Sequence, residues 1–123
     1  MSYRQQKGLS GERLAAEHLE KLGFEIIEHR YRFGHKEIDL IARNDELVVF
    51  VEVKNRRSED YAPVELSVPE RKRRNLVEAA QGYLLEKGIG GEGRQYRFDV
   101  IFLISPGTAG EFRLQHITDS FRP

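Results

Sequence analysis

The sequence predicts an α/β protein with a mixed β-sheet of about five strands flanked by helices, in the order α-β-β-β-α-β-β. Apolar residues recur at helical spacing in two segments, and five other segments are rich in β-branched and aromatic residues. Turn signals join the first three strands, whereas a helix separates the third from the fourth. Such a crossover places these two strands parallel. The 123 residues can bury one core, so residues 1–123 are expected to form a single domain.

The first helix is expected over residues 8–22. Its apolar stripe consists of Ala15, Ala16, Leu19 and Leu22. Gly23 follows the stripe and is expected to end the helix. Gly8 and Gly11 lie near the helix start, where a missing side chain lets the backbone approach a neighbouring element closely.

Three strands are expected next, over residues 24–32, 36–43 and 46–55, with turns at Gly34-His35 and Asn44-Asp45. Each strand segment is short and rich in Val, Ile, Leu or Phe, and each turn carries a residue that tolerates the required backbone. The short connections predict two successive hairpins.

Residues 56–66 are expected to form a loop. The segment Ser67-Val-Pro-Glu70 has the pattern of a capping box and predicts a second helix that ends at about Lys87. The inner stripe of this helix consists of Leu76, Val77, Ala80, Tyr83 and Leu84. Two final strands are expected over residues 96–104 and 111–117.

Charged residues inside apolar strands form the pattern most informative about chemistry. Asp39 lies within Glu37-Ile-Asp-Leu-Ile41, and Glu52 and Lys54 close the run Leu47-Val-Val-Phe-Val-Glu-Val-Lys54. Burying an unpaired carboxylate costs several kcal/mol, so such a group is usually paired or bound to a metal ion.

A two-residue turn at Asn44-Asp45 would set the register of the second hairpin, with Asp39 opposite Phe50. Since side chains alternate between the faces of a strand, Asp39, Glu52 and Lys54 share one face. In this register Asp39 and Glu52 are diagonal neighbours, roughly 7–8 Å apart at the backbone. Two carboxylates at that spacing can bind one divalent cation.

Oxygen ligands favour Mg²⁺ or Mn²⁺, and the chemistry expected of such a site is hydrolysis of a phosphodiester. Lys54 is expected to orient the attacking water or hold a phosphate oxygen. Glu12 lies on the apolar stripe of the first helix, and we expect it to complete the site as a metal ligand and catalytic residue. Against this stands a simpler interpretation, in which a Glu-x-Lys at a strand end is only a pair of solvated charges.

A group of basic residues near this cluster predicts contacts with nucleic acid, and its candidates are Arg56, Arg57, Lys72, Arg73 and Arg74. The last three begin the second helix, where a solvated helix start is the alternative. Cations there oppose the helix dipole, which favours a role beyond stability.

Asp99 lies among Phe98, Val100 and Phe102, and we interpret it as a buried, paired structural acid. The four histidines lack the spacing of metal ligands, so zinc is not expected.

The amino-acid composition limits the partners and cellular locations that can be expected. Twenty basic and twenty acidic residues give zero net charge, which argues against a protein that coats nucleic acid but allows a local basic patch. Cysteine is absent, the chain has no long apolar run, and its first residues do not resemble a signal peptide. A cytoplasmic protein without membrane contact is expected, and a homodimer is compatible with the sequence.

Several motifs together resemble the YraN family of bacterial proteins. They are Gly8-x-x-Gly11-Glu12-x-x-Ala15, Tyr31-Arg32, Glu37-Ile-Asp-Leu-Ile41, Val49-Phe-Val-Glu-Val-Lys54-x-Arg56, Lys72 and Arg97-Phe-Asp-Val100. That family in turn resembles PD-(D/E)XK nucleases, which have the restriction-endonuclease-like fold, and especially archaeal Holliday-junction resolvases. The resemblance implies a metal site at Glu12, Asp39, Glu52 and Lys54. In two places the chain departs from the pattern: Ile38 replaces the usual Pro, and His35-Lys36 displaces a Gly.

Three functions remain open from the sequence. The first is a metal-dependent nuclease acting on branched or structured DNA. The second is a non-catalytic nucleic-acid-binding or adaptor protein that retains the nuclease fold. In the third, the cluster is a salt-bridge network of a structural protein.

Overall fold

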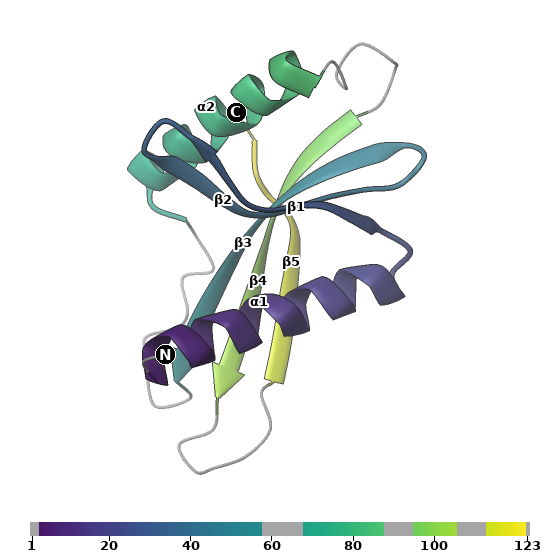
Figure 1. The fold of residues 1–123 in the computed structure, drawn as a ribbon. Helices are drawn as coiled ribbons and strands as arrows, with labels where there is room; N and C mark the ends of the chain where they lie inside the picture. Colours follow the sequence, from purple (N-terminus) through teal and green to yellow (C-terminus); the bar gives the residue numbers. More distant parts are fainter. Residues whose placement is uncertain (1–2, 58–67, 88–94, 106–112, 123) are drawn as a thin grey trace.

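The computed structural model describes residues 3–57, 68–87, 95–105 and 113–122. Its elements follow the predicted order: α1 (Tyr3–Lys21), β1 (Glu25–Phe33), β2 (Lys36–Arg43), β3 (Leu47–Arg57), α2 (Glu70–Lys87), β4 (Gln95–Ser105) and β5 (Arg113–Phe121). Figure 1 shows the strands crossing the middle of the molecule between the two helices. The predicted α/β class is therefore confirmed.

The sheet has five strands in the order β1-β2-β3-β4-β5. Neighbouring strands are antiparallel except β3 and β4, which are parallel over their full length, from Leu47 beside Gln95 to Arg57 beside Ser105. The parallel pair is the one joined through α2, as the crossover predicted. The sheet is therefore mixed.

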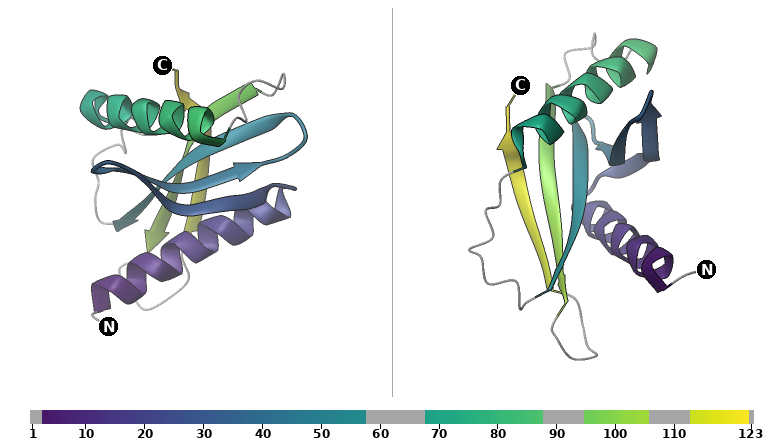
Figure 2. Two further views of the ribbon diagram at one scale, coloured as in Figure 1. Left: turned by 45° about the horizontal axis from the view of Figure 1, so that its top comes forward. Right: turned by 90° about the vertical axis from the view of Figure 1, so that its left-hand side faces the viewer.

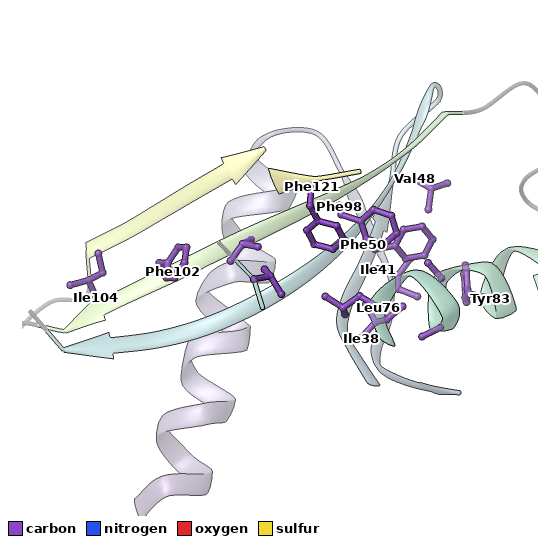
Figure 3. Packing of buried hydrophobic residues seen from close by; sticks show 14 residues of the cluster. Ile38, Ile41, Val48, Phe50, Leu76, Tyr83, Phe98, Phe102, Ile104 and Phe121 are labelled. Atoms are coloured by element: carbon purple, nitrogen blue, oxygen red, sulfur yellow. The ribbon is translucent and has the colours of Figure 1, made fainter. Parts of the chain in front are cut away.

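The helices pack on opposite faces of the sheet, as the left view of Figure 2 shows. Beneath α1 lies one buried apolar cluster, which includes Ala15, Leu19, Leu40, Val51 and Ile101. Beneath α2 lies a second cluster, rich in aromatic rings, that includes Phe50, Leu76, Tyr83, Phe98 and Phe121. Figure 3 shows Phe102 and Ile104 of the same cluster farther along β4, away from α2. Both faces of the central strands are thus covered.

Two glycines fix how α1 meets the sheet. Gly23 has a φ of +94° and follows the helix, where the N–H of Phe24 donates to the carbonyl of Leu19 at 3.0 Å. This closes the helix as predicted. At Gly11, an added Cβ would lie 2.8 Å from Oδ1 of Asn55 and 2.9 Å from a methyl of Leu103. The missing side chain therefore lets α1 approach β3 and β4 next to Glu12.

Most predicted boundaries lie within one residue of the structure, but three elements differ by two residues or more. α1 begins at Tyr3 instead of residue 8, since the polar first turns carry no apolar periodicity that could signal them. β3 continues to Arg57, because its pairing with β4 extends through residues expected in a loop. β5 runs from Arg113 to Phe121 and so continues past residue 117. Residue 67 of the predicted capping box lies outside the described residues.

The predicted register of the second hairpin was wrong. Phe50 pairs with Ile41 instead of Asp39. The connection is longer than a two-residue turn: Asn44 donates its N–H to the carbonyl of Leu47, and its side-chain oxygen accepts the N–H groups of Glu46 and Leu47. An Asn side chain that caps its own turn is not distinguished by sequence from one in a tight turn. Because the slip is two residues, each side chain keeps its predicted face.

Neither described helix is long and apolar enough to span a lipid bilayer.

Candidate functional site

Asp39 and Glu52 meet where β2 and β3 stop pairing. The last residue pair of their ladder is Leu40 with Val51, and continuing it by one residue sets Asp39 opposite Glu52. Beyond this pair, the N–H of Val53 donates to Oδ2 of Asp39 at 2.8 Å. A side-chain carboxylate thus accepts a backbone hydrogen bond of β3 as the two strands separate.

Glu52 is the more deeply buried of the two, with 8% of its surface exposed. Its Oε1 lies 3.3 Å from Nζ of Lys72, in the first turn of α2. Its Oε2 is buried and has no hydrogen-bond partner among the described residues. An ionised carboxylate has several acceptor positions, and leaving them unmet in the interior is costly.

The pKa values of both acids reflect this shortage of partners. Burial and, to a smaller extent, the charge of Glu52 raise the pKa of Asp39 to about 7, although the hydrogen bond from Val53 lowers it. Burial likewise raises the pKa of Glu52. The charge and hydrogen bond of Lys72 oppose this most, followed by the charge of Lys54 and a hydrogen bond with the Asp39 carboxyl group. Two carboxyl groups that disfavour ionisation side by side are electrostatically suited to a cation.

Glu12 is placed near this pair but is bound elsewhere. Nε of Arg30 donates to both of its carboxylate oxygens, at 3.2 and 3.0 Å. Arg30 has a φ of +51°, an unusual backbone for a side chain of this size in a strand. The charge of Glu12 still contributes to the raised pKa of Asp39. No pattern in the sequence indicates Arg30 as the partner of Glu12.

An oxygen-only donor set with one unpartnered buried oxygen fits Mg²⁺ or Mn²⁺, which proteins often bind through two carboxylates and water. Within residues 3–57, 68–87, 95–105 and 113–122, however, no three His, Cys, Asp or Glu side chains converge to hold a metal ion. The structure therefore brings Asp39 and Glu52 together and leaves Glu12 with Arg30.

The predicted nucleic-acid contacts fall into three places. Lys72 is paired with Glu52. Arg56 lies over the ring of Phe102, 5.8 Å from its centre, near the end of β3. Arg73 and Arg74 line a cavity of about 370 Å³ with Phe121 and Arg122. The side chain of Arg57 falls outside the described part of the chain.

A second buried carboxylate lies on β4. Asp99, 1% exposed, accepts hydrogen bonds from Arg97, from His116 and from the N–H of Asp119. These bonds hold its pKa below the usual range despite burial. The interpretation of Asp99 as a paired structural acid is confirmed.

Two histidines extend this network to α1, a contact that was not predicted from the sequence. Nε2 of His116 donates to Asp99 at 2.8 Å, so its Nδ1 accepts from Nε2 of His18 at 3.0 Å when both rings are neutral. Burial lowers the pKa of His18, and the neighbouring His116 and Lys21 lower it further. His18 stands three residues after Ala15 on the helix, and that spacing was the available signal.

The fold and this site define an α/β protein with two neighbouring acids on the β2–β3 hairpin. One of them, Glu52, pairs with Lys72 of α2 and has a carboxylate oxygen without a hydrogen-bond partner among the described residues. Residues 11–103 match the model of the Uncharacterised protein family UPF0102. The chain belongs to this family, which confirms the predicted YraN membership.

Similar relatives have the same family name. A UPF0102 protein of Geobacter sulfurreducens is 37% identical over 93% of this chain and 87% of its own length. One from Desulfosudis oleivorans is 41% identical over 84% and 82%, and one from Flavobacterium johnsoniae is 34% identical over 98% of both. The similarity therefore spans nearly whole proteins.

Proposed function

We propose that this protein is a Mg²⁺- or Mn²⁺-dependent nuclease that hydrolyses phosphodiester bonds, with branched or structured DNA as substrate. The observation that carries the proposal is the unpartnered oxygen of Glu52, buried beside Asp39. In a structural ion pair, such an oxygen would normally accept a hydrogen bond, as the carboxylate of Asp99 accepts one from Arg97. The resemblance of the YraN family to PD-(D/E)XK nucleases supports the same residues.

Asp39 and Glu52 would hold the cation, which supplies positive charge to activate water and to offset the charge of the reacting phosphate. Lys54 follows Glu52 on the same face of β3 and would orient the attacking water or a phosphate oxygen. Arg56 is the next residue on that face, over the ring of Phe102, and would bind a neighbouring phosphate. Glu12 would join the site after leaving Arg30.

A cleavage assay tests the proposal. Single-stranded, duplex, flapped and four-way DNA are incubated with the protein and Mg²⁺ or Mn²⁺. Asp39→Asn and Glu52→Gln keep the side-chain shape and remove the charge that holds the cation, so the cleavage rate should fall about a hundredfold or more. Lys54→Met should slow cleavage and spare metal binding.

Asp45→Asn, in the exposed turn of the same hairpin, is the matched control and should cleave like the wild type. If purified Asp39→Asn protein cleaved as fast as the wild type, the activity would arise elsewhere and the proposal would fail.

One observation favours a second function, that of a non-catalytic nucleic-acid-binding or adaptor protein. Glu12 is engaged by Arg30, and the described residues contain no cluster of three metal-binding side chains. Salt-sensitive DNA binding that needs Arg73 and Arg74, with no cleavage and no metal uptake, would support this function instead.

A further inference from the structure

Lys72 occupies an unusual place for a helix-surface lysine. It lies in the first turn of α2, and its ammonium is directed to the buried carboxylate of Glu52, with 3.3 Å between Nζ and Oε1. The side chain of Lys72 is 45% exposed, whereas that of Glu52 is 9% exposed. One end of this ion pair is therefore anchored in the protein and the other is open to solvent.

The pairing leaves the acidic site incompletely neutralised. Among the described residues, Lys72 alone forms an ion pair with Glu52, although the charge of Lys54 also acts on it. Oε2 of the same carboxylate remains unpartnered within the described part of the chain, and Asp39 carries a further carboxylate. A lysine contributes a single charge on a flexible four-carbon stem, so it can leave without disturbing the backbone. An arginine with a two-pronged bond would be held more firmly.

We propose that Lys72 is the resident counter-ion of the Asp39–Glu52 pair and that a divalent cation displaces it on binding. This inference rests on the proposed function, because it needs the pair to bind a metal. Lys72 and the cation compete for Oε1 of Glu52, and their like charges disfavour occupying the site together. The displaced ammonium stays attached to α2 beside the site, where a phosphate oxygen is its natural acceptor.

The competition is measured as Mn²⁺ affinity by calorimetry, at pH 8 for every variant. Lys72→Met keeps the length of the side chain and removes its charge. Freed of a competing ion pair, the variant should bind Mn²⁺ about fivefold or more tightly than the wild type. Without metal, it should also unfold at a lower urea concentration, since Glu52 has lost its counter-ion.

Arg71→Met is the matched control, because it removes one exposed positive charge from the same helical turn. Its Mn²⁺ affinity should stay within about twofold of the wild type, since exposed charges are largely screened. Glu52→Gln should abolish the binding in both backgrounds. If Lys72→Met failed to fold, Lys72→Gln would serve in the same comparison.

The outcomes separate the two proposals. Wild-type binding that depends on Glu52, with Lys72→Met no tighter than Arg71→Met, overturns the displacement and leaves the metal site standing. No Mn²⁺ binding to the wild type or to Lys72→Met overturns both. Binding by Lys72→Met that exceeds the wild type supports the displacement even when wild-type affinity is weak.

Discussion

Two carboxylate sites lie on the same sheet, and their pKa values are shifted in opposite directions. Asp99 accepts bonds from Arg97, His116 and the backbone, and its pKa is lowered. Asp39 and Glu52 share fewer donors, and the pKa of each is raised. Burial acts on both sites in the same direction, so the supply of donors makes the difference. A satisfied acid stabilises the fold, whereas an unsatisfied pair is available to a ligand.

The largest expected effect on stability is at Asp99, whose carboxylate is fully hydrogen-bonded. Asp99→Asn removes the charge that pairs with Arg97 and His116, so the free energy of unfolding at pH 7 should fall by about 2–3 kcal/mol. Urea denaturation measures this loss. Asp119→Asn, on an exposed carboxylate that pairs with Arg122, is the control and should change stability by less than about 0.5 kcal/mol. A loss at Asp99 no larger than at Asp119 would erase the contrast between the sites.

The same substitution at the other site should act with the opposite sign. Asp39→Asn relieves the repulsion between half-buried Asp39 and buried Glu52, so the metal-free protein should gain about 1 kcal/mol in unfolding free energy at pH 8. The measurement is again urea denaturation, with a chelator present. A loss greater than about 1 kcal/mol would show that the Asp39 charge stabilises the fold, as the salt-bridge interpretation requires.

The pH dependence should distinguish the sites by direction. The folded pKa of Asp39 is about 7 and lies above its ordinary value of 3.8, so the folded state binds the proton more tightly. Its contribution therefore falls as pH rises from about 4 to 7, and this decline should be weaker in Asp39→Asn. Asp99 has a lowered pKa, so its contribution is present above its ordinary pKa and is lost in acid.

The measurement is the free energy of unfolding in urea between about pH 4 and about pH 7. If this free energy changed equally with pH in the wild type and in Asp39→Asn, the raised pKa of Asp39 would be contradicted.

Much of the fold could be predicted from the sequence because it depends on local patterns. The stripes of α1 and α2, the stop at Gly23 and the parallel crossover follow from periodicity and chain connection. The Asp39–Glu52 pair could be predicted because an error of two residues in register preserves the faces. The structure shows these two acids as neighbours, while their role as metal ligands remains a prediction.

The partners of the acids could not be predicted, because they come from distant elements. Arg30 reaches Glu12 across 18 positions, and His18 reaches His116 across 98. Such contacts depend on how α1 lies against the sheet, which the close approach at Gly11 decides. Nothing in local composition distinguishes Arg30 from the neighbouring Arg32, which pairs with Glu37.

The position of Glu52 in the chain has a consequence for folding. The β2–β3 hairpin is a local structure, and such contacts form early because little chain entropy is lost in closing them. It brings Asp39 and Glu52 together before α2, which begins beyond residue 67, can deliver Lys72. The early hairpin therefore carries two facing acids with the charge of Lys54 nearby but without their ion-pair partner Lys72. If the pair binds a divalent cation as proposed, refolding followed by circular dichroism should be faster in Mn²⁺ than in a chelator.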